Sequence, residues 1–282
     1  MRRILRRAFL PALGALPASA AAPAHYFVHH RRLPNLARPT RFTEKVIRRK
    51  LFDRDPRLPT MADKVAVKEF VAATIGAQYV TPTLWSGESL PPLQERDWPV
   101  PYVLKANNGS GTNIFVRRAD EVDWGAIESR CRTWLAASHA RWAAEWAYAE
   151  IAPKLMVEPH IGDPSRLPLD YKLFVFGGTV RYVEVDTDRA LDHKRTFFDR
   201  DWRRQPFSLG YPLDPRPIAR PASLEAMIAA AETLSEGFSF VRIDVYDIDG
   251  APRFGEMTFY PDAGIARFSP DSVDLEFGAL WR

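Results

Sequence analysis

Cysteine is almost absent from this chain, whose 282 residues include only Cys131. A single cysteine excludes a disulfide within the chain and any cysteine-rich metal site, and it fits a reducing cytosol. Charge of one sign is also scarce, because 39 basic and 35 acidic residues leave a formal net charge of +4 that comes largely from the first 50 residues. Nucleic-acid-binding proteins normally concentrate basic residues on one face, so we expect no nucleic-acid partner.

Long hydrophobic runs are missing as well. Residues 1–24 combine a basic start, a modest apolar run and small residues, which is the outline of a secretory signal. Pro11 and Pro17 interrupt the apolar run, and it is too short to span a bilayer. The alternative, which we favour, is a retained basic leader that lies on a membrane surface or on a partner.

Common catalytic motifs are absent too. There is no G-x-x-x-x-G-K-[ST] loop, no G-x-S-x-G elbow and no H-E-x-x-H helix. A dinucleotide fingerprint is missing, because Gly109-Ser110-Gly111 lacks the third glycine and no helix is predicted there. The six histidines are scattered along the chain, so a zinc enzyme is not expected.

A hydrophobic content of 46% and eight tryptophans nevertheless predict a substantial core. Apolar residues at helical spacing predict helices over residues 43–52, 61–76, 123–149 and 223–237. Asp63 and Ser223 are predicted N-caps, and Gly76 is a predicted C-cap. Tryptophans of the third helix are expected to share one face and pack in the core: Trp134, Trp142 and Trp146.

Short apolar stretches predict strands at 79–83, 102–104, 114–116 and 155–161. Two further stretches, 170–186 and 240–258, predict β-hairpins that turn at Gly177-Gly178 and at Asp249-Gly250, the latter a type I′ signal. Residues 188–220 show no clear period. Within them, Asp192-His193-Lys194-Arg195 is either a source of positive charge for a phosphate or a solvated basic turn.

The stretch from Pro101 to Thr112, PYVLKANNGSGT, is the first candidate site. A short apolar strand delivers Lys105 to the start of a small-residue loop formed by Asn107, Asn108, Gly109, Ser110, Gly111 and Thr112. Glycines let backbone N–H groups approach an anion closely, and the lysine adds a point charge, so the stretch is suited to a phosphate. Taken alone, it is better explained as a β-hairpin with a polar turn and a solvated lysine.

The predicted hairpin 240–258 is the second candidate site. Asp244 lies inside an apolar strand, and Glu256 lies on the partner strand across the turn. If the two carboxylates share a face, they repel each other unless a cation lies between them, and Mg²⁺ held by one or two carboxylates plus substrate phosphates is the natural choice. The alternative is a structural network in which Arg242, on the same face as Asp244, neutralises the carboxylates.

Seven segments occur in an order that resembles the ATP-grasp superfamily and, more closely, the TupA-like ATP-grasp family of teichuronopeptide and cell-surface polysaccharide biosynthesis. They are FTEKVIRRKLFDRDP, MADKVAVKEFVAATIG, YVLKANNGSGTNI, EWAYAEIAPKLMVEPHI, DYKLFVFGG, FVRIDVYDI and FGEMTFYPDAG, within residues 34–282. The resemblance implies an α+β fold in which two subdomains clamp ATP. The implied division is a basic N-terminal extension with a helix at 1–60, a first subdomain at 61–158 and a second at 159–282.

The resemblance also implies roles for particular residues. Lys64 and Lys105 would contact the ATP phosphates, and the loop 107–112 would close over the β- and γ-phosphates. Glu158 and the backbone at Pro159-His160 would face the adenine. Asp170 would meet the ribose, and Lys172 would face the nucleotide. Asp244, Glu256 and Thr258 would hold Mg²⁺, with Arg242 near the transferred phosphoryl group.

Two positions depart from the family pattern. Many members of the superfamily have Glu-x-Asn as the last metal motif, whereas this chain has Glu256-Met257-Thr258. A threonine hydroxyl binds Mg²⁺ less strongly than an amide oxygen, so the second metal position is in doubt. Asn108 stands where a histidine often occurs in the family, which puts the contacts of the loop in doubt.

The resemblance implies an ATP- and Mg²⁺-dependent carboxylate–amine ligase that forms an acyl phosphate and releases ADP. Its substrates would be a small-molecule or glycan-linked carboxylate and an amine, in a surface-polysaccharide pathway that also employs glycosyltransferases. The alternatives are an ATP-grasp kinase and a nucleotide-binding partner of glycosyltransferases with reduced catalysis. Because nucleotide is cytosolic, we expect a cytoplasmic protein, with peripheral contact at the inner face of the membrane through the basic N-terminus.

Overall fold

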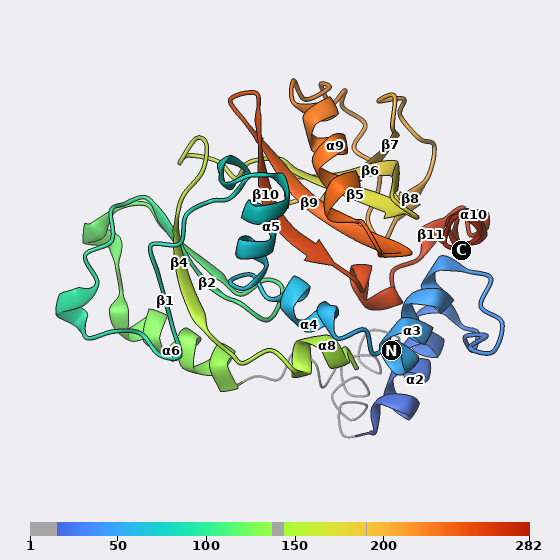
Figure 1. Ribbon diagram of the computed structural model, residues 1–282, viewed down its shortest axis with the longest axis horizontal. Helices are drawn as coiled ribbons and strands as arrows, with labels where there is room; N and C mark the ends of the chain where they lie inside the picture. The colour runs from blue at the N-terminus through green and yellow to red at the C-terminus, as the bar shows by residue number, and fades with distance from the viewer. Residues whose placement is uncertain (1–15, 137–143, 190) are drawn as a thin grey trace.

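The computed structural model describes residues 16–136, 144–189 and 191–282. Its described strands form two antiparallel sheets and a short two-stranded pair (Figure 1). The small sheet has the order β1-β4-β2-β3, with β1 Trp85–Gly87, β2 Tyr102–Ala106, β3 Asn113–Val116 and β4 Leu155–Pro159. The large sheet has the order β10-β9-β5-β6-β7, with β5 Asp170–Phe176, β6 Thr179–Thr187, β7 Lys194–Asp199, β9 Phe240–Ile248 and β10 Ala251–Thr258. The pair joins β8 Ser208–Leu209 to β11 Phe268–Ser269.

The described helices surround these sheets. They are α2 Ala18–His30, α3 Phe42–Phe52, α4 Arg57–Ala62, α5 Val67–Ile75, α6 Trp124–Ala136, α8 Trp146–Ala149, α9 Leu224–Leu234 and α10 Ser272–Leu280. The mixture of helices and antiparallel sheets confirms the predicted α+β class.

The small sheet buries one face against α6. Successive strand residues point to opposite faces, so alternate residues of β2, β3 and β4 reach the helix and form a cluster with Ile127 and Cys131. Burial raises the pKa of the Cys131 thiol to about 11. A thiol that stays protonated in this way packs as a small apolar group and is a poor nucleophile.

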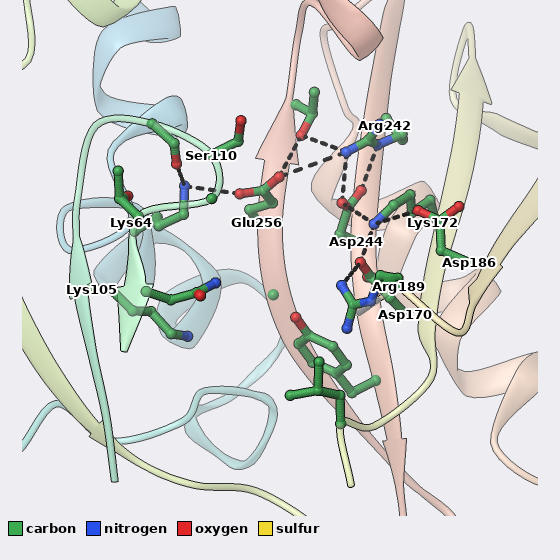
Figure 2. Close-up of a pocket in the computed structure, with 18 of the residues that line it drawn as sticks. Lys64, Lys105, Ser110, Asp170, Lys172, Asp186, Arg189, Arg242, Asp244 and Glu256 are labelled. Carbon is green, nitrogen blue, oxygen red and sulfur yellow. Dashed lines mark hydrogen bonds and ion pairs between the residues drawn. The ribbon is translucent and has the colours of Figure 1, made fainter. Parts of the chain in front are cut away.

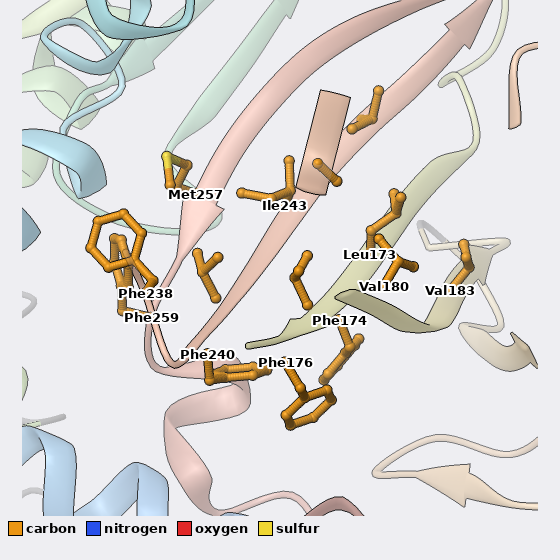
Figure 3. Close-up of a cluster of buried hydrophobic side chains, with 14 of the residues drawn as sticks. Leu173, Phe174, Phe176, Val180, Val183, Phe238, Phe240, Ile243, Met257 and Phe259 are labelled. Atoms are coloured by element: carbon orange, nitrogen blue, oxygen red, sulfur yellow. The ribbon is translucent and has the colours of Figure 1, made fainter. Parts of the chain in front are cut away.

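One face of the large sheet is apolar, with α9 and α5 lying over it (Figure 1). Leu173, Ile243 and Met257 are paired across the neighbouring strands β5, β9 and β10, and all three are buried (Figure 3). They share a cluster with Met227 and Ile228 of α9. Complete burial of each such side chain contributes about 1.5–3 kcal/mol, so this layer holds α9 to the sheet.

The opposite face of the large sheet is divided along its strands. Toward one end, Phe174, Phe176 and Phe240 pack against Phe42 of α3, and the ring centroids of Phe42 and Phe240 lie 5.0 Å apart. Phe277 of α10 contacts the same aromatic layer. Farther along these strands, the positions on the same face carry charged side chains: Asp170, Lys172, Glu184, Asp186, Arg242 and Asp244. The helices therefore cover only the aromatic half and leave a charged wall.

Both predicted hairpin turns are confirmed. Gly177 and Gly178 have φ of 54° and 78°, and Asp249 and Gly250 have φ of 54° and 78°. Positive φ at both central residues is the requirement of a type I′ turn, which matches the twist of the flanking strands.

The predicted helix caps are confirmed only in part. Gly76 ends α5 with φ 108°, as predicted. Helix α5 begins at Val67 rather than next to Asp63, whose carboxylate instead accepts hydrogen bonds from the N–H groups of Val65 and Ala66 in the preceding turn. Ser223 stands at the N-cap of α9, but its side chain makes no capping hydrogen bond.

The strand predicted at 79–83 is wrong, and β1 lies at Trp85–Gly87. The carbonyl oxygen of Thr81 accepts a hydrogen bond of 2.7 Å from Lys68 Nζ instead of joining a ladder. Pairing with β4 starts only at Leu84, whose N–H donates to the carbonyl oxygen of Val157 over 2.8 Å.

The single helix predicted over 123–149 is also wrong. Helix α6 ends at Ala136, and Ala144 has φ of 55°, a left-handed value that a continuous right-handed helix cannot contain. Trp134 packs in the cluster of the small sheet, whereas Trp146 packs in that of the large sheet. The predicted common face of the three tryptophans therefore does not exist, and Trp142 lies outside the described residues.

Residues 188–220, for which no element was predicted, contain β7, the edge strand of the large sheet, and β8. No alternation marks β7, because Arg195 and Thr196 are buried next to the buried Phe197 and Phe198. Residues 192–195 were predicted to be either a solvated basic turn or a source of positive charge for a phosphate. Neither interpretation describes Arg195, because its side chain is buried and paired with carboxylates. Burial of this charge among carboxylates is the reason that its strand looks irregular in the sequence.

The predicted N-terminal extension is partly described. Residues 1–15 of the predicted leader lie outside the described residues, and the residues from Ala18 onward form α2, where Ala22 and Tyr26 pack on Ile47 of α3. Among the described residues, no helix has the length and apolar character needed to cross a membrane. The boundaries at 60 and 158 stay predictions, and the packing adds that α3 and α5 both contribute to the large-sheet core through Phe42, Val67 and Val71.

Candidate functional site

A cavity of about 920 Å³ lies between the small sheet and the charged half of the large sheet. The wall from the small sheet and its loop includes most of the predicted nucleotide residues. Figure 2 shows Lys64, Lys105 and Ser110 on the side opposite the carboxylates of the large sheet. The cavity brings together Lys64, Lys105, Gly109, Ser110, Gly111, Thr112, Glu158, His160, Asp170, Lys172, Arg242, Asp244, Glu256 and Thr258.

Neither Asn108 nor Asn107, the first two residues of the predicted phosphate loop, lines this cavity. Asn107 anchors the loop instead. Its side chain is fully buried, and its amide donates 3.1 Å hydrogen bonds to Asp63 Oδ2 and to the carbonyl oxygen of Ala152. Its side-chain oxygen accepts from the N–H of Lys154 over 2.8 Å. The structure thus corrects the prediction for Asn107, because every polar atom of the side chain is used to anchor the start of the loop.

The loop that follows β2 reaches into the cleft. Lys64 Nζ donates to the carbonyl oxygen of Gly109 over 2.7 Å and lies 2.9 Å from Glu256 Oε2, so it ties the loop to the large sheet (Figure 2). Gly111 has φ of 71°, and a Cβ there would meet no atom within 4 Å. Ser110 and Gly111 are exposed, so the loop offers its backbone to the cavity.

Glu158 is held by two lysines. Its Oε2 lies 2.5 Å from Lys105 Nζ, and its Oε1 pairs with Lys68 Nζ. Burial alone would raise the pKa of Glu158, but the two ammonium groups lower it below its ordinary value. Lys105 therefore enters the cavity as the partner of an ionised carboxylate that β4 fixes in place.

The apolar part of the cavity lies beside this pair. Phe115 of β3 and His160 meet edge to face with their ring centroids 6.1 Å apart, and Val103, Pro159 and Ile161 also line the wall. The backbone N–H of His160 donates to the carbonyl oxygen of Pro101 over 2.9 Å. Nδ1 of the His160 ring is buried and makes no hydrogen bond among the described residues. Burial, followed by the charge of Arg117, lowers the pKa of His160. A flat, neutral slot of this kind suits an aromatic base.

A β-bulge sets the carboxylate pair opposite each other. Uninterrupted pairing outward from the Asp249-Gly250 turn would put Gly255 opposite Asp244, but the register shifts between Phe254 and Glu256, so that Glu256 is paired with Asp244. Directly opposite residues share a face of the sheet, whereas a slip of one residue turns a side chain to the other face. The bulge therefore brings both carboxylates to the cavity.

Cations surround the carboxylate pair. Arg242 binds Asp244 in a bidentate manner, with Nε–Oδ1 and Nη2–Oδ2 both at 2.7 Å, and Lys172 Nζ lies 3.1 Å from Asp244 Oδ2. Burial raises the pKa of Asp244 against the opposing effect of these cations. Burial also opposes ionisation of Glu256, but Lys64 and Arg242 lower its pKa to about 2.

The residues present fit a Mg²⁺ ion shared with phosphates. Among the described residues, no group of three or more His, Cys, Asp or Glu side chains is arranged to hold a metal by itself. Mg²⁺ commonly takes one or two carboxylates and completes its shell with water and substrate phosphate oxygens. Among the residues that the structure describes, Asp244 Oδ1 accepts only from Arg242, so a lone pair remains for a metal. The Arg–Asp–Glu network predicted as the alternative is also present, since Arg242 Nη2 lies 3.7 Å from Glu256 Oε1.

Thr258 and Asp170 complete the predicted set. The Thr258 hydroxyl donates to Glu256 Oε1 over 3.1 Å and accepts from Arg242 Nη2 over 3.3 Å, so it supports Glu256. Asp170 Oδ2 accepts from Arg189 over 2.8 Å and pairs with Lys172. The other oxygen, Oδ1, is buried without a hydrogen bond among the described residues, which leaves an acceptor for a ligand hydroxyl.

Sequence reasoning missed other charged residues that line the cavity or support its wall, namely Glu184, Asp186, Arg189 and Asp262. A signal for the first two was present: charged residues two apart inside an apolar strand, as in TVRYVEVDT, repeat the pattern of Arg242 and Asp244. Charges at alternate positions of a buried strand indicate a polar cavity wall rather than an exposed face.

Two units that enclose a charged cleft, with a lysine-bearing glycine loop on one wall and paired carboxylates on an antiparallel sheet opposite, define an ATP-grasp protein. A profile of the family described as TupA-like ATPgrasp matches residues 44–282, and the chain belongs to this family. A comparison with curated proteins finds no match.

Solved structures with similar folds are distant in sequence. The D-alanine–D-alanine ligase from Bacillus anthracis complexed with ATP is 14% identical at a TM-score of 0.43, over 71% of this chain and 55% of that chain. The L-amino acid ligase from Bacillus licheniformis is 12% identical at a TM-score of 0.47, over 79% and 50%. The N5-carboxyaminoimidazole ribonucleotide synthetase from Thermus thermophilus is 16% identical at 0.43, over 74% and 48%. The chain thus spans about half the length of these proteins.

Proposed function

We propose that this protein is an ATP- and Mg²⁺-dependent ligase that joins a carboxylate to an amine through an acyl phosphate and releases ADP. The observation that carries the proposal is the opposition of Lys64, Lys105 and the glycine loop to the Asp244–Glu256 pair across one cavity. Family membership supports a role in building cell-surface polysaccharide or a teichuronopeptide-like polymer.

The residues of the cleft suggest how the nucleotide would bind. The slot of Phe115 and His160 would take the adenine, and the unpaired Oδ1 of Asp170 would accept from a ribose hydroxyl. Lys105 and the backbone N–H groups of Gly109–Thr112 would meet the phosphates. Asp244 and Glu256 would hold Mg²⁺, which would neutralise charge on the phosphates.

Phosphoryl transfer asks the protein mainly for positioning and charge stabilisation. Arg242 is held by Asp244 and by Thr258, so its guanidinium is fixed where the γ-phosphate would lie against the carboxylate pair. Arg242 and Lys172 would offset the negative charge of the phosphoryl group as it passes from the ADP oxygen to the attacking oxygen of the carboxylate substrate. Attack of the amine on the acyl phosphate would then release phosphate and leave an amide.

The test is an ADP-release screen over the amino acids as amines, with glucuronic acid as the carboxylate, in the presence of Mg²⁺. ADP formation that requires the amine, the carboxylate and Mg²⁺ together is the expected result. Asp244→Asn and Glu256→Gln should abolish it, and full ADP formation by both variants would contradict the metal assignment. A phosphorylated product that persists without any amine would instead identify a kinase.

One observation favours a second candidate, a nucleotide-binding partner of glycosyltransferases with reduced catalysis. Both oxygens of Asp244 are engaged by Arg242 and Lys172, and Thr258 replaces the usual amide ligand. This candidate predicts that calorimetry detects ATP binding while no pair of substrates produces ADP. For either candidate we propose a cytoplasmic location, with peripheral membrane contact through the basic N-terminus.

A further inference from the structure

The cavity continues past the carboxylate pair to a second polar region, here called the far end. It is lined by Asp186 of β6, His193 and Arg195 at the start of β7, Tyr211 after β8, and Asp262 in the turn Pro261–Gly264. None of these residues has a part in the nucleotide site proposed above.

Arg195 is held by protein groups on several sides. Its Nε lies 2.9 Å from Asp186 Oδ1 and 3.0 Å from Glu184 Oε1, and its Nη1 donates to Asp262 Oδ2 over 2.9 Å and to the carbonyl oxygen of Leu209 over 3.1 Å. Its side chain is only 4% exposed. The charge of Arg195 is therefore met largely by protein carboxylates rather than offered to a substrate anion.

The far end carries an excess of negative charge. Three carboxylates, on Glu184, Asp186 and Asp262, surround one guanidinium, so these four groups carry a formal sum of two negative charges. The next cation, Lys172, lies 3.9 Å from Asp186 Oδ2 and is shared with Asp170 and Asp244. Burial raises the pKa of Glu184 to about 8, and if Glu184 takes a proton one negative charge remains. Either way, this region attracts a cation.

The accessible groups at the far end are suited to a cation. The side chains of Asp262 and His193 are 23% and 20% exposed, and Tyr211 is 42% exposed. His193 Nε2 lies 2.9 Å from Asp186 Oδ1, and its ring lies against the Tyr211 ring at a tilt of 32° with the centroids 3.7 Å apart. The Arg195 guanidinium lies 5.0 Å from the centroid of the same Tyr211 ring. A carboxylate oxygen and a ring nitrogen are partners that bind an ammonium group.

We propose that the far end binds the amino group of the amine substrate as an ammonium ion. The inference rests on the ligase function proposed above and names the place of its second substrate. Lys172 links this end to the reaction centre, because its Nζ lies 3.1 Å from Asp244 Oδ2 and 3.9 Å from Asp186 Oδ2. Strands β6 and β9 are both neighbours of β5, so their backbones lie roughly 10 Å apart, two strand spacings. The carboxylates of Asp186 and Asp244 are closer together than that, because both reach the same Lys172 nitrogen.

The ammonium ion must lose a proton before its nitrogen can attack. The negative charge of Asp186, 2.9 Å from His193 Nε2, attracts a proton to Nε2 and so leaves a lone pair on Nδ1. Nδ1 takes the proton from the ammonium, and Asp186 stabilises the resulting imidazolium. The nitrogen lone pair then forms the C–N bond to the acyl carbon, while the C–O bond to phosphate breaks and phosphate leaves with the electron pair.

The test compares a primary amine with its acetylated form. L-alaninamide and N-acetyl-L-alaninamide are titrated into full-length protein loaded with ADP and Mg²⁺, and binding is followed by saturation-transfer NMR. We expect alaninamide to bind at least tenfold more tightly. Asp262→Asn and His193→Gln should each remove most of this preference, because each changes one accessible partner of the ammonium.

Two controls separate this inference from the function on which it rests. Asp192→Asn alters an exposed carboxylate next to His193 that does not line the cavity, and it should retain the preference for alaninamide. ADP affinity, measured by calorimetry, should be unchanged in all three variants. Because Asp262→Asn removes a partner of the buried Arg195 guanidinium, thermal melts accompany each variant, and His193→Gln decides the outcome if Asp262→Asn unfolds.

The inference is overturned if the protein binds ADP but binds L-alaninamide and N-acetyl-L-alaninamide equally well, or binds neither. It is also overturned if the His193→Gln variant keeps the preference for L-alaninamide. Failure to bind ADP or ATP at all would instead overturn the proposed function. Tighter binding of glucuronate than of alaninamide, lost in His193→Gln, would show that the far end takes an anion and would also overturn the inference.

Discussion

Gly255 should be indispensable to the site, although no atom of it would touch a ligand. It lies in the bulge between Phe254 and Glu256, where an added Cβ would stand 3.0 Å from the backbone oxygen of Asp244 and 3.2 Å from the Tyr246 ring. Backbone cannot move aside as a flexible side chain can. Overpacking of this kind costs about 1–3 kcal/mol, so Gly255→Ala should lower the melting temperature by roughly 2–12 °C at 2–4 °C per kcal/mol.

The same substitution should weaken the metal site more than the fold. If the bulge opens, Glu256 moves away from its place opposite Asp244 and from Lys64, 2.9 Å away. Disturbing the support of a metal ligand typically costs roughly 10–100-fold in metal affinity, and calorimetry with ATP, with and without Mg²⁺, measures that loss. Gly125→Ala at the start of α6 is the control, because the nearest atom to its Cβ would lie 3.4 Å away. If the Gly255→Ala variant has the melting temperature and the Mg²⁺-ATP affinity of the wild type, the bulge at Gly255 is not what sets Glu256 opposite Asp244.

Three further predictions follow. Lys105→Met should weaken ATP binding by about 10–150-fold in calorimetry, the value of a charge-assisted hydrogen bond of about 1.5–3 kcal/mol, and an unchanged affinity would contradict its role. Phe42→Ala should cost about 3–5 kcal/mol in urea unfolding because it empties the aromatic layer, whereas Phe52→Ala, at a residue 60% exposed, should cost little. Cys131, whose pKa burial raises to about 11, stays a thiol at pH 8, so iodoacetamide should modify it only after unfolding.

The local chemistry of the chain was readable where one residue type dictates one conformation. Asp249-Gly250 and Gly177-Gly178 both adopt the positive φ values predicted for their turns. Strand-borne Lys105, Asp244 and Glu256 were found because a charge inside an apolar strand needs a partner or a ligand. All three line the cavity.

The errors have a common physical cause, which is that side chains far away in the sequence override local patterns. Lys68 takes the Thr81 carbonyl out of the predicted strand. Asn107 fits a phosphate loop by composition, yet Asp63 and Lys154 draw its side chain into the interior. Arg195 resembles a solvated basic residue, but three carboxylates bury it.

The sequence alone was therefore enough for the α+β class, the family and the chemistry of the two candidate segments, because these depend on short-range periodicity and on residue types in order. The tertiary structure decided which of those residues meet. It placed Glu256 opposite Asp244 through a bulge that turn counting does not reveal, and it covered half of one sheet face with Phe42 and Phe277. Register and burial arise from packing between segments far apart along the chain, so neither is encoded in any one of them.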